Sequence, residues 1–121
     1  MLLGQFASTI GEKHQTGLPK KFRDELGDSL IVTKGFEACL LVVSEENWKT
    51  LLEGTAGRPF ISRDTRELQR FLLGNAAQVT LDNKGRFIVP EFLRSYAHLH
   101  DEIVYVGIER FVEIWDKNTW E

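Results

Sequence analysis

The chain has 121 residues, of which 42% are hydrophobic and 27% charged, and its formal net charge at pH 7 is −3. This length predicts one domain whose core needs no metal or disulfide, and the single cysteine excludes an intrachain disulfide and fits a cytoplasmic protein. The aliphatic run Cys39–Val43 is far too short to cross a bilayer, and the N-terminus lacks a signal-peptide pattern, so we expect no membrane segment.

One stretch of the sequence occurs twice. "TIGEKHQTGLPKKFR" (9–23) and "TLDNKGRFIVPEFLR" (80–94) share Thr, Lys, Pro and Arg at an offset of 71 residues, which becomes 72 toward the matching Trp48 and Trp120. Repeats of this kind organise a fold. We therefore predict a single domain over 1–121, with a first copy at about 5–48, a second copy at about 76–120 and a helical connector at about 45–75.

The first copy predicts strand, turn, strand, helix and two further strands. "ASTI" forms the first strand, and Pro19 opens a short helix that Gly27 stops. "LIVTK" and "CLLVV" are apolar and β-branched enough for two strands. Gly35 is expected to begin the turn between them.

The connector predicts two helices. Ser44 can cap "EENWKTLLEG", "TAGRPFIS" is a loop, and Ser62 can cap "RDTRELQRFLLGN". Leu68, Phe71 and Leu72 form one apolar stripe at helical spacing, typical of core or of a subunit contact.

The second copy repeats the order of the first, with strands "AQVTL" and "RFIVP", a helix opened by Pro90, and strands "EIVYVG" and "FVEIW". Gly107 is expected to begin the last turn. One copy has too few residues for a robust core and exposes strand edges. Two copies packed about a pseudo-twofold axis predict an α+β fold with a barrel-like core and outer helices.

The turn in "TLDNKGRFI" carries the most specific chemistry. Asp82 can accept backbone N–H groups as an Asx-turn, and Gly85 can supply the positive φ that such a turn requires. Lys84 and Arg86 then leave a rigid tip, which suits phosphate contact or recognition of a guanine edge. The alternative is an ordinary hairpin with a solvated Lys and Arg.

Positive charge is concentrated in the duplicated stretch, although the chain as a whole is acidic. Such a split can orient a protein on a polyanion, and a solvated charged face is the alternative. Residues 11–23 contain one acidic side chain, Glu12, against the basic residues Lys13, Lys20, Lys21 and Arg23.

No pattern indicates an enzyme, a cofactor, a metal site or a small-molecule substrate. His98 and His100 lack further ligands at metal-binding spacing, so a structural or solvent role is expected. Cys39 lies in a strand pattern and is expected in the core.

Four segments resemble the MraZ family: "TLDNKGRFIVPEFLR", with the family's D-x-x-x-R signature, and also "LLGNAAQVTLD", "VGIERFVEIWDKNTWE" and "MLLGQF". The resemblance runs from Met1 to Glu121. It implies two AbrB-like swapped-hairpin repeats in a cytoplasmic, nucleoid-associated bacterial transcription regulator, usually a repressor, of the division and cell-wall gene cluster. It also implies a ring-shaped homo-oligomer of about eight or more subunits that binds tandem short promoter repeats in double-stranded DNA.

The family signature is intact only in the second copy, at Asp82 and Arg86. In the first copy Gly11 replaces the aspartate, His14 the turn glycine, and Gln15 the arginine that is a principal DNA contact in the family. Histidine tolerates positive φ, and glutamine can pair with adenine, so we expect this copy to contact DNA at a different base. The alternative is an antitoxin-like protein-interaction module with weakened DNA binding.

The expected DNA-binding residues are Lys84, Arg86, Lys13, His14, Gln15, Lys20 and Lys21. Asp82, Gly85 and Gly11 are expected to shape the turns. Arg23 and Arg94 are expected to contact phosphate or to form ion pairs with Asp24 and Glu102.

Overall fold

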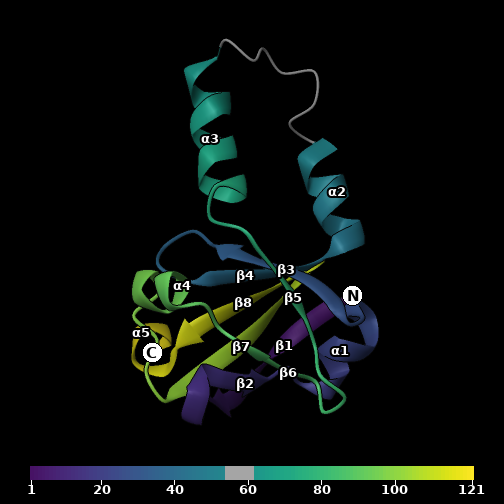
Figure 1. Ribbon diagram of the computed structural model, residues 1–121, viewed down its shortest axis with the longest axis vertical. Helices are drawn as coiled ribbons and strands as arrows, with labels where there is room; N and C mark the ends of the chain where they lie inside the picture. The colour runs from purple at the N-terminus through teal and green to yellow at the C-terminus, as the bar shows by residue number, and fades with distance from the viewer. Residues whose placement is uncertain (54–61) are drawn as a thin grey trace.

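The structure is a computed structural model that describes residues 1–53 and 62–121. A six-stranded antiparallel sheet, with strand order β1-β7-β8-β4-β3-β5, forms its centre, and β2 and β6 pair as a separate two-stranded ribbon (Figure 1). The strands are β1 (Leu2–Thr9), β2 (Gln15–Gly17), β3 (Ser29–Lys34), β4 (Leu40–Ser44), β5 (Ala77–Thr80), β6 (Arg86–Ile88), β7 (Glu102–Glu109) and β8 (Phe111–Asp116). The helices are the 3₁₀ turn η1 (Glu12–His14), α1 (Lys20–Leu26), α2 (Glu45–Glu53), α3 (Arg63–Leu73), α4 (Glu91–Tyr96) and α5 (Lys117–Trp120).

The two copies interleave. The first strand of each copy pairs with the third strand of the other, β1 with β7 and β5 with β3, and the second strands β2 and β6 pair with each other. Only the hairpins β3–β4 and β7–β8 stay within one copy. Each copy therefore contains its elements in the predicted order. The first and second strands of each copy, however, pair with strands of the other copy.

The α+β class is confirmed, but the expected barrel does not close. In the described part of the chain, β1 pairs only with β7 and β5 only with β3, so these two strands remain the edges of an open sheet. The chain reaches its second strands by leaving this sheet, because β2 and β6 hydrogen-bond to each other instead of continuing it.

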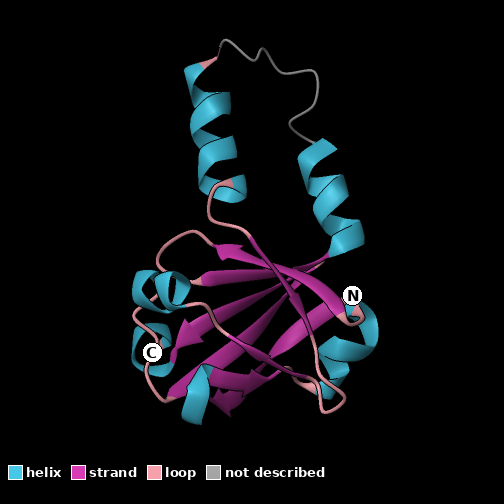
Figure 2. Cartoon of the chain, in the orientation of Figure 1, coloured by secondary structure: helices cyan, strands magenta, loops and turns pink. Residues whose placement is uncertain are grey.

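The main core lies between the six-stranded sheet and the ribbon with α1 and α4. Phe22 of α1, Leu93 of α4, Phe87 of β6 and Tyr105 of β7 are all buried there. This packing fixes the ribbon against the sheet, because Phe87 is anchored in the core between two exposed neighbours. Figure 2 shows the helices arranged around the sheet.

A second, smaller core lies where α2 and α3 meet the sheet. Trp48 of α2 and Leu72 of α3 pack with Ile31 and Val43. Both helices begin with the predicted caps: Ser44 Oγ accepts from Asn47 N at 3.1 Å, and Ser62 Oγ accepts from Thr65 N at 3.4 Å. The expected loop at 55–61 and the helix end at Gly54 lie outside the described residues.

Two local expectations were wrong. Gly107 lies inside β7 opposite Gly4, not at a turn, and a side chain there would overlap the backbone of Leu2 and Leu3. The close approach of the β1 backbone explains why residue 107 is a glycine. The first strand is also longer than "ASTI", because β1 already pairs with β7 from Leu2 onward.

Candidate nucleic-acid interface

The segment Asp82–Arg86, here called turn two, is a tight, hydrogen-bonded turn. Asp82 N donates to Arg86 O at 3.0 Å and Gly85 N donates to Asp82 O at 2.9 Å. Gly85 has φ +75°, which glycine adopts at low cost. The turn leads directly into β6, so its geometry sets the direction in which Arg86 leaves the backbone.

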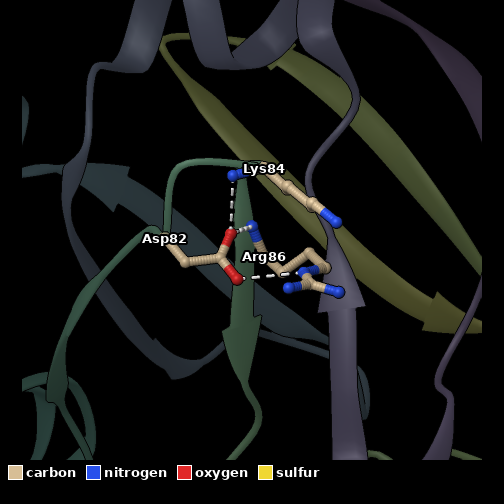
Figure 3. Close-up of polar contacts among 3 residues, drawn as sticks. All are labelled: Asp82, Lys84 and Arg86. Carbon is tan, nitrogen blue, oxygen red and sulfur yellow. Dashed lines mark hydrogen bonds and ion pairs between the residues drawn. The ribbon is translucent and has the colours of Figure 1, made fainter.

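The carboxylate of Asp82 organises turn two from inside (Figure 3). Its Oδ1 accepts from Arg86 N at 2.8 Å and from Lys84 N at 2.9 Å, and its Oδ2 accepts from Arg86 Nε at 2.9 Å. These are the hydrogen bonds of an Asx-turn with an added ion pair. The pKa of Asp82 is lowered, first by the Arg86 backbone N–H and further by the Lys84 N–H and the Arg86 side chain, which outweigh partial desolvation.

Asp82 holds the Arg86 side chain at Nε and does not bond to the two terminal nitrogens of the guanidinium. The Arg86 side chain is 43% exposed. Within the described residues, only its Nε is engaged, so the fork of the two terminal nitrogens stays open. Lys84 is exposed beside it, and Figure 3 shows the Lys84 and Arg86 side chains extending to the same side of the turn.

The segment Gly11–Gln15, here called turn one, keeps the same backbone hydrogen bonds. Gly11 N donates to Gln15 O at 2.9 Å and His14 N donates to Gly11 O at 3.2 Å, which are the counterparts of the two bonds in turn two. Gly11 offers no carboxylate, however. Both Lys13 (φ +63°) and His14 (φ +60°) are left-handed, so turn one holds two strained residues where turn two uses one glycine.

The two turns sit at opposite ends of the β2–β6 ribbon. Val89 N donates to His14 O at 3.0 Å and Leu18 N donates to Gly85 O at 2.9 Å, so each turn is bonded to the copy that it does not belong to. The ribbon lies at the end of the molecule opposite α2 and α3 (Figure 1). The two turns are thus held in a fixed relation on one end of the fold.

The ribbon has one buried and one solvent-facing side. Thr16 and Phe87, which pair with each other, are buried, and Thr16 Oγ1 lies 3.0 Å from the Tyr105 hydroxyl oxygen. The residues on either side of this pair form the solvent-facing side, here called the ribbon face: Gln15, Gly17, Arg86 and Ile88. Sequence reasoning missed Gly17 and Ile88, although the alternation of exposed and buried residues along "RFI" is the signal that marks Ile88.

The lysines of α1 lie outside the two turns and are partly engaged. Lys20 forms an exposed ion pair with Asp24 at 3.5 Å, and Lys21 Nζ lies 5.9 Å from the centre of the Phe6 ring. Both side chains are exposed. Their helix begins beside turn two, because Leu18 N donates to Gly85 O and Arg23 of α1 lies across that turn.

Arg23 and Arg94 occupy different positions although they are counterparts in the repeat. Arg23 lies across turn two, where a side chain at Gly85 would overlap its guanidinium. His14 is the counterpart of Gly85 in turn one, and Arg94 Nε donates to Val89 O at 3.0 Å.

The expected ion pairs of these two arginines are absent from the described part of the chain. Asp24 pairs with Lys20, and Glu102 pairs with Lys117 at 3.7 Å. Arg94 is bonded to a backbone oxygen instead, and Arg23 lies across turn two.

Cys39, His98 and His100 lie outside the two turns and the ribbon face. Burial, together with the nearby Glu113, raises the pKa of Cys39 to about 12, and its thiol donates to Phe36 O at 3.1 Å. His100 N and Nδ1 lie 2.8 and 3.1 Å from Asp116 Oδ1, and His98 is exposed. Residues 1–53 and 62–121 contain no cluster of three metal-ligating side chains and no helix long and apolar enough to cross a membrane.

Comparison with known proteins places the chain in one family. A family model described as "MraZ protein, putative antitoxin-like" matches residues 1–71 and again residues 72–121. Proteins named "Transcriptional regulator MraZ" from Caldanaerobacter subterraneus and Thermoanaerobacter pseudethanolicus are 38% and 39% identical over 121 residues, which is 100% of this chain and 85% of each relative. The relative from a Roseiflexus species is 37% identical over the same span. The two matches of the family model follow the internal repeat, and this chain belongs to the MraZ family.

Proposed function

We propose that this chain is a transcriptional regulator that binds double-stranded DNA in a sequence-specific manner through turn one, turn two and the ribbon face. The observation that carries the proposal is the Arg86 side chain, which is exposed and held at Nε by Asp82. Its terminal nitrogens form the planar fork that matches O6 and N7 of guanine. A two-stranded ribbon is also narrow enough to enter the major groove.

The basic residues around the two turns supply the sequence-independent part of binding. Lys84 lies beside Arg86, and Lys13 and His14 form the exposed tip of turn one. Such cations neutralise phosphates and fix the protein on the duplex. Lys20 and Lys21 extend this surface on α1, and the turns themselves are shaped by Asp82, Gly85 and Gly11.

Turn one contacts a different base from turn two. Gln15 occupies the place of Arg86 and has no charge, but its amide can donate to N7 and accept from N6 of adenine. Because the backbone hydrogen bonds of turn one are retained, Gln15 leaves the backbone as Arg86 does. We therefore assign adenine to Gln15 and guanine to Arg86.

Family membership supports the finer assignments. They are a ring-shaped homo-oligomer of about eight or more subunits, tandem short promoter repeats, repression of the division and cell-wall gene cluster, and a cytoplasmic, nucleoid-associated location. The interleaved pairing of the two copies supports the swapped-hairpin description. A ring would present many copies of the ribbon face, so weak single contacts would gain from effective concentration.

A salt-dependent titration of the DNA upstream of the gene tests the proposal. Arg86→Ala is expected to weaken binding by about 5- to 150-fold, the loss of one bidentate contact. Arg63→Ala is the matched control, because it also removes one exposed arginine but lies on α3, at the opposite end from the ribbon. Equal binding by both variants would overturn the role of Arg86.

The same titration tests Gln15. On DNA in which the contacted adenine is replaced by guanine, wild type is expected to bind more weakly, whereas Gln15→Ala is expected to lose much less affinity on this replacement. A wild-type protein that is indifferent to this replacement would remove the assignment of adenine to Gln15.

The second candidate function is an antitoxin-like protein-interaction module. Turn one favours it, because Gly11 and Gln15 lack the carboxylate and the guanidinium that turn two uses. The family description also contains the term antitoxin-like. The salt titration separates the two functions: DNA binding through lysines and arginines gives a steep decline of log K with log salt, whereas a slope near zero favours the protein-interaction module.

A further inference from the structure

Ile88 is an exposed aliphatic residue in the middle of a polar, cationic surface. It is 57% exposed, although its neighbours Phe87 and Val89 are 4% and 0% exposed. The fold therefore gains little from the Ile88 side chain, because β6 is already anchored through the two residues on either side of it.

The ribbon face is asymmetric at this position. The counterpart of Ile88 in the first copy is Gly17, which has no side chain, and a Cβ placed on Gly17 would lie 3.8 Å from Arg86 Cγ. Arg86 thus passes over Gly17, and Ile88 is left directly opposite Gln15 in the ribbon register. The ribbon face consists of two adjacent pairs, Arg86 with Gly17 and Ile88 with Gln15.

We propose that Ile88 contacts the 5-methyl group of thymine, and that Ile88 and Gln15 together recognise one A·T base pair. This inference rests on the proposed DNA-binding function. Thymine presents the only apolar group among the four bases in the major groove, and aliphatic side chains contact it. Side chains directly opposite each other on a ribbon are about 5 Å apart, which suits the adenine edge and the thymine methyl of a single pair.

The charge around Ile88 favours DNA over a second copy of this chain as the occupant of the ribbon face. Arg86 and Lys84 lie on one side, and Lys13 and His14 lie at the tip of turn one. A second ribbon face would bring Arg86, Lys84 and Lys13 against their own counterparts, which is unfavourable, whereas the phosphates that flank a major groove complement them.

A double-mutant cycle between the protein and the DNA tests this inference. Each thymine of the bound site is replaced in turn by deoxyuridine, which lacks only the methyl group. At one position wild type is expected to lose about three- to fivefold in affinity, the contribution of roughly one buried methyl. Ile88→Ala is expected to lose a similar factor on unmodified DNA and to be insensitive to deoxyuridine at that position. Ile88→Val keeps a methyl in reach and is expected to retain the sensitivity.

The control and the contrary outcomes are distinct. Ile108→Ala removes an equally simple exposed side chain, 45% exposed on β7, and should keep the full deoxyuridine effect. If Arg86→Ala weakens binding but no thymine couples to Ile88, this inference fails and the proposed function stands. If the sensitive thymine is not opposite the adenine that Gln15 selects, the single A·T pair is wrong. If Arg86→Ala leaves binding unchanged, both proposals fail.

Discussion

At the scale of single residues, the two turns show how one backbone path is obtained with different side chains. His14 and Gly85 make the same backbone hydrogen bond at positive φ, but only glycine does so without steric cost. The absence of a Cβ at Gly85 also lets Arg23 cross turn two, whereas its counterpart Arg94 donates to Val89 O.

This difference predicts opposite effects of two substitutions on stability. Gly85→Ala is expected to lower the free energy of unfolding by about 1–2 kcal/mol, because alanine is strained at φ +75° and its Cβ displaces Arg23. His14→Gly is expected to raise the free energy of unfolding by up to about 1 kcal/mol. Part of this gain is lost because glycine makes the unfolded chain more flexible. Urea unfolding at equal protein concentration measures both; changes of the same sign would contradict the comparison.

At the scale of elements, local signals predicted the elements well and their partners poorly. Caps at Ser44 and Ser62 were visible because a cap and its helix are neighbours in sequence. The Asp82 turn was visible for the same reason, since the Asp, Gly and Arg spacing contains all of its hydrogen bonds. The role of Gly107 was not visible, because its reason is the close approach of β1 from the other copy.

The same limit applies to the candidate site. The D-x-x-x-R spacing pointed to Arg86, but the left-handed backbone of Lys13 was not predicted. The positions of Ile88 opposite Gln15 and of Gly17 opposite Arg86 follow from the register of the ribbon, which the sequence does not show. Sequence thus predicted the contacts within turn two, whereas the composition of the ribbon face depends on pairing between the copies.

Asp116 joins three elements near the end of the second copy. Its Oδ1 accepts from His100 N at 2.8 Å, which ties the loop before β7 to the end of β8, and its Oδ2 accepts from Asn118 N at 3.2 Å, which caps α5. Burial raises the pKa of Asp116, but the hydrogen bonds from His100 and Asn118 outweigh it, so the net pKa lies below the ordinary value of 3.8. The ionised carboxylate is therefore the form that stabilises these joints.

Asp116→Ala is expected to lower the free energy of unfolding by about 1–3 kcal/mol at pH 7, because two partly buried N–H groups lose a charged acceptor. A depressed pKa contributes stability that is present above the unfolded value and is lost as the pH falls through the folded value. The difference between wild type and Asp116→Ala should therefore shrink below pH 3.8. Urea unfolding at pH 7 and at a series of acidic pH values measures it; a constant difference would contradict the assignment.

At the scale of the whole molecule, the two copies form one cooperative unit. All eight residues of β1 pair with β7, and the four residues of β5 pair with β3. The pairing of β4 with β8 and the ribbon join the copies twice more. The relative position of turn one and turn two therefore depends on the complete interleaved sheet, and neither turn is presented correctly by one copy alone.

This interleaving predicts that residues 1–53 and 62–121 do not fold separately as monomers, because each fragment lacks the strands that pair with its own first and second strands. Mixed at equal concentration, they are expected to restore the dispersed amide spectrum of the intact chain and its DNA binding. Phe87→Ala in the second fragment is the control, since losing this buried ring costs about 3–5 kcal/mol and should weaken reassembly. NMR spectra combined with light scattering measure the outcome; a dispersed spectrum from a monomeric fragment would show that the copies are independent units.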